Sequence, residues 1–351
     1  MSHPAIARIH GGPDEYGIPL HDFSTNSNAC GPCPSAQAAV ASADATTYPD
    51  ASYTRLRQQL ANFHGVAVRR VVLAASASEF IFRITALAVQ RGVRAVSVPT
   101  HSYGDYAQAA RAHQLPVLAD AALAGLHWSC EPSSPLGGEQ SGLSALTALT
   151  ALAEGLNNQP APNIVVLDRA YEPLRLSGVP TLSEAQLQTV WQLWSPNKAL
   201  GLTGIRAAYA IAPQGAAVDT GADIDTLNQL CPSWPIGAHG VAMLQAWTQP
   251  DVQAWLASSL DTLRGWKARQ LQMCADWGWV CNASQANFFC AKPLLSSSLD
   301  LEQTLAALRL QGIKLRDAAS FGLPGQVRLA VRSPAAQDVL AHALGPWVLR
   351  R

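Results

Sequence analysis

Short apolar runs alternate with alanine-rich stretches through the middle of the chain, and this alternation predicts the order of its elements. The apolar runs at 69–75 and 94–100 have the character of buried strands, and the stretches 78–92 and 103–114 that follow them have the spacing of helices. Further strands are expected at 115–121, 163–171, 189–195 and 205–212. Strands that alternate with helices form an α/β fold with a mostly parallel sheet, and ligands bind beyond the carboxyl ends of its strands.

The pattern changes at the sequence CPSWPIG. A long helical stretch is expected over 242–277, with Pro250 as a candidate break. The remaining strands are expected near 278–282, 287–291 and 328–332, and the remaining helices near 141–159, 299–312 and 335–344. The elements after residue 240 predict a smaller α+β domain over 241–351. Residues 45–240 form the predicted large domain. The N-terminal segment, 1–44, is expected to pack with the small domain.

The composition excludes several classes of protein. The 351 residues include 24 basic and 24 acidic side chains, so the formal charge of +0 gives no reason to bind nucleic acid or an anionic membrane. A hydrophobic content of 48% with 14% charged residues excludes a disordered chain. No apolar run reaches the ~18 residues of a membrane span. The first residues do not resemble a signal peptide, and an odd number of scattered cysteines is no disulfide framework. We therefore expect a cytoplasmic globular protein.

Lys198 stands in the sequence WSPNKALGLTGIR, between two predicted strands. A lysine in such a turn can form a Schiff base or bind a phosphate, whereas an isolated lysine is most often a surface residue. Ser195 lies three residues before it and Arg206 eight residues after it, and both side chains bind anions. Because Gly201 and Gly204 also allow a close approach of the backbone, these neighbours favour a functional lysine.

Asp168 ends the predicted buried strand in VVLDRAY, where ligands of a parallel sheet bind. There it could keep a pyridine nitrogen protonated, and the alternative is an ordinary helix cap or turn. The sequence LAASASEF leads from a strand into a helix. Its small residues would present free N–H groups to a phosphate, and the alternative is a plain tight turn.

Taken in order, these motifs resemble those of the fold-type I pyridoxal-phosphate (PLP) enzymes. The order is a phosphate turn, an aromatic residue after the next strand, a proline-flanked turn, a strand-end aspartate, Ser-x-x-Lys, and an arginine eight residues later. More narrowly, the chain resembles the branch of histidinol-phosphate aminotransferase and threonine-phosphate decarboxylase over nearly its whole length. The resemblance implies a large domain with a mostly parallel seven-stranded sheet and helices on both faces, a smaller α+β domain, PLP as the cofactor, and a homodimer with shared active sites.

The resemblance also implies roles for individual residues. Lys198 would bind the cofactor covalently, Asp168 would pair with the ring nitrogen, and Tyr171 would hydrogen-bond the ring 3-oxygen. Tyr103 would stack on the ring, with His101 as the alternative. The residues implied for the cofactor phosphate are Ser76, Ala77, Ser78, Ser195, Arg206 and, from the partner subunit, Tyr48.

Three departures from the family pattern bear on the activity. Ser134, in the sequence PSSPLG, replaces the asparagine that contacts the ring 3-oxygen. Arg169 follows Asp168 where the family has glutamate, and Asn197 precedes Lys198 where serine is common. The changes at Ser133-Ser134 and at Arg169 motivate the alternative of a noncatalytic binding protein with a PLP fold.

Both ends of the chain resemble the decarboxylase branch more than the aminotransferases. His10, Gly11 and Gly12 match that branch's substrate-phosphate motif, and DFSTN, which ends at Asn26, matches its next motif. Near the other end, in QVRLAVR, Arg328 matches the arginine that binds the substrate carboxylate, and Arg332 adds a second cation. The alternatives are an ordinary turn for the first motif and a solvated strand end for Arg332.

We therefore predict decarboxylation of L-threonine O-3-phosphate to (R)-1-aminopropan-2-yl phosphate, as in cobalamin biosynthesis. The first alternative is transamination of the histidinol-phosphate type. In both reactions the substrate is a small phosphorylated amino compound.

Two further motifs suggest other chemistry. Cys30-Gly-Pro-Cys33 has the spacing of a thioredoxin-type redox pair, but no strand precedes it and Pro34 follows it, which favours an incidental turn. The 9 histidines offer no spacing typical of zinc ligands, so we expect no metal site.

Overall fold

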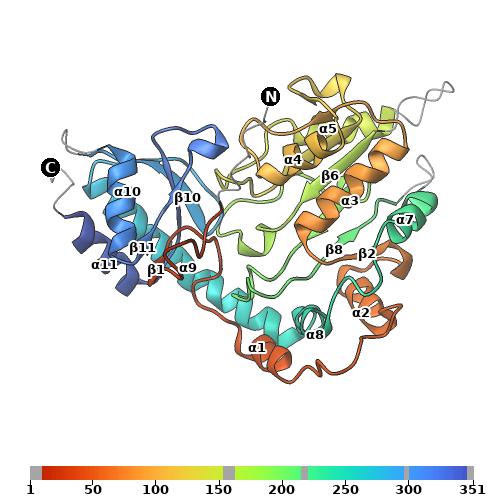
Figure 1. Ribbon diagram of the computed structural model, residues 1–351, viewed down its shortest axis with the longest axis horizontal. Helices are drawn as coiled ribbons and strands as arrows, with labels where there is room; N and C mark the ends of the chain where they lie inside the picture. Colours follow the sequence, from red (N-terminus) through yellow and green to blue (C-terminus); the bar gives the residue numbers. More distant parts are fainter. Residues whose placement is uncertain (1–9, 153–162, 215–219, 296–299, 346–351) are drawn as a thin grey trace.

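The computed structural model describes residues 10–152, 163–214, 220–295 and 300–345. Figure 1 shows a larger part that contains the main sheet and a smaller part formed mostly by the last third of the chain, coloured blue. The long helix α9 (Pro250–Asp276) runs between them.

Seven strands form the main sheet in the order β2-β8-β7-β6-β5-β3-β4. They are β2 (Val71–Ala74), β3 (Val96–Ser97), β4 (Val117–Leu118), β5 (Leu126–Cys130), β6 (Ile164–Asp168), β7 (Trp191–Trp194) and β8 (Ala208–Ile211). Strand β8 is antiparallel to both of its neighbours, and the other pairs are parallel. The predicted α/β fold with a mostly parallel sheet is confirmed.

Helices cover both faces of this sheet. Successive side chains of β2 point to opposite faces, and all four are buried, so both faces must be covered. Val72 and Ala74 belong to a core cluster with α3 (Ala77–Gln90), α4 (Gly104–Ala112) and α7 (Thr220–Gln229). Val71 and Leu73 belong to a second cluster on the opposite face. The helices of that second cluster are α1 (Pro34–Ala41), α2 (Thr54–His64), α8 (Ala238–Trp247) and the first half of α9.

Two shorter helices lie beside β6. They are α5 (Leu143–Leu152) and α6 (Glu184–Leu187). Leu143 and Leu146 of α5 and Leu187 of α6 pack with Val165 and Leu167 in a separate small cluster.

The smaller part contains a four-stranded antiparallel sheet in the order β12-β13-β10-β9. Its strands are β9 (Val280–Cys281), β10 (Phe288–Lys292), β12 (Arg316–Asp317) and β13 (Val327–Ala330). Two helices, α10 (Leu301–Leu310) and α11 (Pro334–Leu344), pack with the end of α9 around Phe289 and Leu329. The last strand pair joins β1 (His21–Asp22) in parallel to β11 (Ile313–Lys314).

The predicted break at Pro250 is confirmed. Helix α8 ends at Trp247, and Pro250 is the first residue of α9, where its missing N–H is tolerated. Leu256 and Leu263 of α9 belong to the core of the large part, whereas Cys274 belongs to that of the small part. One continuous helix therefore joins the two cores.

The predicted boundaries at residues 44 and 240 stay a prediction. Within the segment 1–44, β1 pairs with β11 in the small part, whereas Ala36 of α1 packs in the core of the large part. None of the described helices combines the length and the apolar character that crossing a membrane would require.

Candidate active site

A cavity of about 440 Å³ opens at the carboxyl ends of the parallel strands. Asp168 ends β6, and Cys130 ends β5 beside it in the sheet register. Ser195 follows β7 directly, and the small part contributes Arg328 from β13. This is the edge at which open α/β sheets bind their ligands.

Most of the residues predicted for the site are brought together here. Those that line the cavity are His10, Gly11, Asn26, Ser76, Ala77, Ser78, Tyr103, Ser134, Asp168, Tyr171, Ser195, Lys198, Arg206 and Arg328. Gly12, Tyr48 and Arg332 do not line it. The roles predicted for all of these residues remain proposals.

The backbone around Lys198 is held by the N-terminal segment. The amide of Asn28 donates to the carbonyl of Lys198 at 2.9 Å, and the Asn28 side chain donates to the carbonyl of Ala199 at 3.0 Å. The amino group of Lys198 lies 3.5 Å from Ser195 Oγ and 5.5 Å from the centre of the Tyr171 ring. The turn is therefore anchored while its amino group reaches into the cavity.

Asp168 is buried, and protein groups already hold both of its oxygens. Tyr106 donates to Oδ2 at 2.7 Å, and the amide of Ala170 donates to Oδ1 at 2.9 Å. Burial raises the pKa of Asp168, while the bond from Tyr106 and the charge of Lys198 oppose that rise. These contacts hold a carboxylate in a fixed position on the cavity wall.

Sequence reasoning missed Tyr106. This residue is fully buried, and its ring stacks on Trp128 with 4.5 Å between ring centroids. The available signal was its spacing, because residues three apart on a helix share a face and Tyr103 begins the same turn. Tyr106 thus links the aromatic wall of the cavity to Asp168.

One end of the cavity is suited to a phosphate group. Helix α3 begins there, and Ser76 caps it by accepting a hydrogen bond from the amide of Glu79 at 3.1 Å. Ala77 and Ser78 form the first turn, whose N–H groups have no partner within a helix. Arg206 lines the same cavity, so the helix end and a cation both favour an anion.

Two arginines from the small part line the cavity with Phe321. Arg316 and Arg328 are direct partners in the β12–β13 register. Their guanidinium carbons lie 4.7 Å and 5.2 Å from the centre of the Phe321 ring. Burial lowers the pKa of both side chains, that of Arg316 to about 10. Two buried cations side by side favour the binding of an anion.

Arg316 takes the place that the sequence suggested for Arg332. It donates to the carbonyl of Asp317 at 2.6 Å and to Ser320 Oγ at 2.7 Å, which orients its guanidinium group. Arg332 lies beyond the end of β13, and its amide donates to Gln270 Oε1 at 3.0 Å. The available signal for Arg316 was the sequence LRDAASF, which lies shortly before the QVRLAVR motif.

The two N-terminal motifs are joined to each other. Gly12 donates its amide to Ser24 Oγ at 2.8 Å, and its carbonyl accepts from Lys314 at 2.7 Å. A Cβ on Gly11 would lie 2.2 Å from the carbonyl oxygen of Ser24, so only glycine fits there. The backbone of Gly12 therefore has a structural role, whereas His10 and Asn26 line the cavity.

Tyr48 and His101 lie elsewhere. Tyr48 is 78% exposed and stacks on Trp234, with 4.5 Å between ring centroids. His101 Nδ1 lies 2.7 Å from the carbonyl oxygen of Phe321, in a contact between the large and small parts. Of the two residues considered for ring stacking, Tyr103 lines the cavity and His101 does not.

The fold and the cavity together define a class of protein. A lysine after β7, a buried aspartate at the end of β6 and a helix N-terminus after β2 meet in one cavity, which is the site expected of a PLP-dependent enzyme. The model of the family "Aminotransferase class I and II" matches residues 19–122 and 143–344. The chain therefore belongs to the class I and II aminotransferase family of PLP-dependent enzymes.

Similar proteins cover almost the whole chain. A histidinol-phosphate aminotransferase of Jannaschia sp. is 28% identical and covers 94% of this chain and 92% of its own length. The histidinol-phosphate aminotransferase of Sinorhizobium meliloti, solved with pyridoxal-5'-phosphate, has a TM-score of 0.75 at 21% identity, covering 92% and 89% of the two chains. The L-threonine-O-3-phosphate decarboxylase of Porphyromonas gingivalis has a TM-score of 0.74 at 19% identity, covering 92% and 98%.

The residues present fit the PLP cofactor that this family uses. Arg328 Nε, Asn26 Oδ1 and Asn197 Oδ1 are buried and have no hydrogen-bond partner within the described part of the chain. All three residues line the cavity, so a ligand with both donors and acceptors would satisfy them. When bound, PLP supplies an electron-withdrawing ring that takes up the electrons of a bond broken at the substrate's Cα.

Proposed function

We propose that the chain removes the carboxyl group of L-threonine O-3-phosphate. The observation that carries this proposal is the shared cavity. Lys198 and Asp168 face it together with Arg316, Arg328 and His10. The proposed substrate has a carboxylate and a phosphate besides its amine, so it needs two anion sites close to the lysine.

Each side chain has a distinct part in this proposal. Lys198 carries the cofactor and, once the substrate amine has replaced it, moves protons at Cα. Asp168 stays charged and holds the ring nitrogen protonated, with Tyr106 fixing its orientation. Tyr171 donates to the ring 3-oxygen, and Ser134 lies on the same wall.

The remaining cavity residues position the cofactor and the substrate. Tyr103 packs on the cofactor ring, and Arg328 binds the substrate carboxylate through a bidentate pair of hydrogen bonds. Arg316, His10 and the backbone at Gly11 bind the substrate phosphate. The residues proposed for the cofactor phosphate are Ser76, Ala77, Ser78, Ser195 and Arg206, with Tyr48 from a partner subunit.

Binding at Arg328 also bears on which bond breaks. If Arg328 holds the substrate carboxylate, its bidentate contact would fix the orientation of the substrate's Cα over a cofactor held by Lys198 and Asp168. That orientation would determine whether the bond to the carboxylate or the Cα–H bond breaks.

Transamination of the histidinol-phosphate type is the second candidate. The observation in its favour is the naming of the curated relatives, which are 23–28% identical and carry the name histidinol-phosphate aminotransferase. These relatives favour this reaction over decarboxylation. The motifs around His10 and Asn26, and their place in the cavity, favour the decarboxylase.

One experiment separates the two candidates. Purified protein with PLP is given O-phosphothreonine alone, and released carbon dioxide is measured. In parallel it is given histidinol phosphate with 2-oxoglutarate, and glutamate formation is measured. Carbon dioxide release that the K198A variant lacks supports decarboxylation. Glutamate formation without carbon dioxide release contradicts it and supports the aminotransferase.

A further inference from the structure

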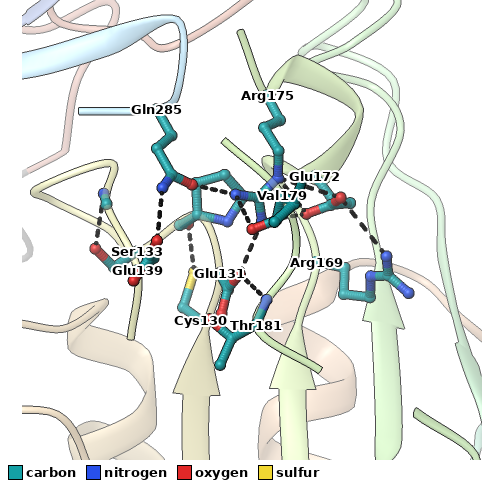
Figure 2. Close-up of polar contacts among 12 residues, drawn as sticks. Cys130, Glu131, Ser133, Glu139, Arg169, Glu172, Arg175, Val179, Thr181 and Gln285 are labelled. Atoms are coloured by element: carbon teal, nitrogen blue, oxygen red, sulfur yellow. Dashed lines mark hydrogen bonds and ion pairs between the residues drawn. The ribbon is translucent and has the colours of Figure 1, made fainter. Parts of the chain in front are cut away.

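Arg175 is the centre of a buried polar network beside the cavity (Figure 2). Its Nη2 atom lies 2.9 Å from Glu131 Oε1 and 2.7 Å from Glu172 Oε2. Its Nη1 atom donates to Gln285 Oε1. The side chains of Arg175 and Glu131 are only 8% and 3% exposed, so solvent hardly screens this contact.

The three side chains that Arg175 contacts come from three separate segments. Glu131 follows β5 and opens the loop 131–138, which carries Ser134 to the cavity wall. Glu172 follows Tyr171 directly, just after β6. Gln285 belongs to the small part, between β9 and β10. One guanidinium group therefore joins the small part to both strand-end segments.

Backbone hydrogen bonds repeat the same connection. The amide of Gln285 donates to the carbonyl of Gly137 at 2.6 Å, and the amide of Leu176 donates to the carbonyl of Gln285 at 2.6 Å. Gln285 thus touches the end of the loop 131–138 and the segment after Tyr171. In Figure 2 the Gln285 side chain lies between Arg175 and Glu139. Its Nε2 atom donates to Glu139 Oε1 at 3.1 Å.

The small-part end of this network is itself fixed. Lys267, on α9, donates to the carbonyl oxygens of Ser284 and Ala286 at 2.6 Å and 2.8 Å. The residues on both sides of Gln285 are therefore anchored to the helix that joins the two cores. A movement of the small part would reach Gln285 through this anchor.

We propose that Arg175 is a positioning residue that couples the small-part segment 284–286 to the placement of Ser134 and Tyr171 in the cavity. A planar guanidinium group can reach Glu131, Glu172 and Gln285 at once, whereas the single ammonium of lysine cannot do so with the same geometry. Without the cation, the buried carboxylate of Glu131 and the partly buried one of Glu172 would lose their shared partner, and the loop 131–138 would move away from Tyr171.

This inference rests on the proposed roles of Ser134 and Tyr171 at the cofactor's 3-oxygen. Those two side chains reach the cavity from the two segments that Arg175 joins. Their spacing sets the hydrogen bonds available to that oxygen, so Arg175 would influence the cofactor without touching it. The cavity lining does not include Arg175.

The first test is hydrogen exchange measured by mass spectrometry on the full chain, with and without PLP. The variants are Arg175→Met and Arg175→Lys. The control is Arg269→Met, because Arg269 donates to Gln337 and Asp338 within the small part. We expect amides of 131–139 and 283–287 to exchange about tenfold faster in R175M. The R175K variant should be intermediate, and R269M should match the wild type in these segments.

The second test is a pH titration of the visible absorbance of the bound cofactor. R175M should shift its midpoint by about one pH unit, because the groups at the 3-oxygen move. R269M should leave the midpoint unchanged. A purely structural role would lower the melting temperature of both variants and leave the midpoint in place, which would overturn the proposal.

Gln285→Ala keeps the proposal testable if R175M does not fold. This variant removes the side-chain contacts of Gln285 with Arg175 and Glu139, keeps its backbone hydrogen bonds, and leaves both ion pairs of Arg175 intact. We expect faster exchange in 131–139 and a smaller shift of the absorbance midpoint. Unchanged exchange in 131–139 would overturn the proposal. The exchange measured without PLP does not depend on the reaction, so failure of the proposed function would leave that result standing.

Discussion

Tyr106 donates a hydrogen bond of 2.7 Å to Asp168, from the first turn of α4 to the last residue of β6. This bond lowers the pKa of a carboxyl group that burial raises. Trp128 stacks on the Tyr106 ring and leaves the phenol little freedom. The charge of Asp168 therefore depends on a residue that lies 62 positions away in the chain.

Replacing Tyr106 with phenylalanine tests this dependence. The variant keeps the stacked ring but removes a hydrogen bond to a charged group, which contributes about 1.5–3 kcal/mol. The pKa of Asp168 would rise further, so the acidic limb of the pH profile of kcat/KM should move to higher pH. The affinity for PLP should also fall. An acidic limb at the wild-type pH would contradict the role given to Tyr106.

Lys198→Ala should abolish the visible absorbance of the bound cofactor and lower kcat by at least about 10³-fold, because the lysine both binds the cofactor and moves protons. Absorbance spectra and the two product assays measure this. Lys292→Ala is a matched control, since Lys292 is an exposed residue of β10 outside the cavity. Retained activity in K198A would exclude Lys198 as the cofactor lysine.

Sequence and structure differ on which arginine accompanies Arg328 in the site, Arg332 or Arg316. Because Arg316 and Arg328 line the cavity and Arg332 does not, alanine at either of the first two should lower kcat/KM by about 10²-fold or more. Arg332→Ala should change it by less than about threefold. Steady-state kinetics with O-phosphothreonine or histidinol phosphate measures this. A large effect of R332A with little effect of R316A would restore the prediction from sequence.

His64 should make the protein less stable in mild acid. Burial lowers the pKa of His64 from 6.5 to about 4. His64 Nε2 lies 2.8 Å from the Tyr209 hydroxyl, which accepts from Trp247 at 3.0 Å and can donate its own proton to a neutral His64 ring. The unfolded chain binds the proton at higher pH than the folded one. This contribution is therefore present above pH 6.5 and is lost as pH falls from about 6.5 to about 4, by at most about 1.4 kcal/mol per pH unit.

Urea unfolding at pH 7 and pH 5 measures this effect, with His64→Gln as the matched variant. Glutamine can still accept a hydrogen bond from Tyr209 but does not titrate. The free energy of unfolding of H64Q should fall less between the two pH values than that of the wild type. Equal losses in both proteins would show that another group controls the acid sensitivity.

The proposed homodimer with shared sites predicts complementation between two inactive variants. K198A and Tyr48→Ala should each be inactive alone. A mixed dimer has one site with both side chains intact, so an equal mixture after subunit exchange should regain about a quarter of the wild-type activity. Light scattering should give the mass of a dimer. A monomer by light scattering, or no recovery in a mixture that has exchanged subunits, would contradict shared sites.

The order of most elements and the functional residues at the strand ends could be predicted from the sequence alone. Lys198, Asp168 and the turn at Ser76 could be recognised because each depends on its immediate neighbours. A strand end followed by a helix places such residues at the ligand edge of a parallel sheet. Strand β5 escaped recognition because His127 and Ser129 interrupt its apolar run, although both side chains are fully buried.

Which distant side chains come into contact depends on the tertiary structure. In a continuous strand Arg328 and Arg332 would share a face, but β13 ends at Ala330 and the chain turns into α11. Arg316 instead lies opposite Arg328 because two strands pair in that register. The contacts of Arg175 with Glu131 and Gln285 span 44 and 110 residues of sequence. Hydrogen bonds over such separations depend on how strands and loops pack, and local patterns in the sequence do not predict that packing.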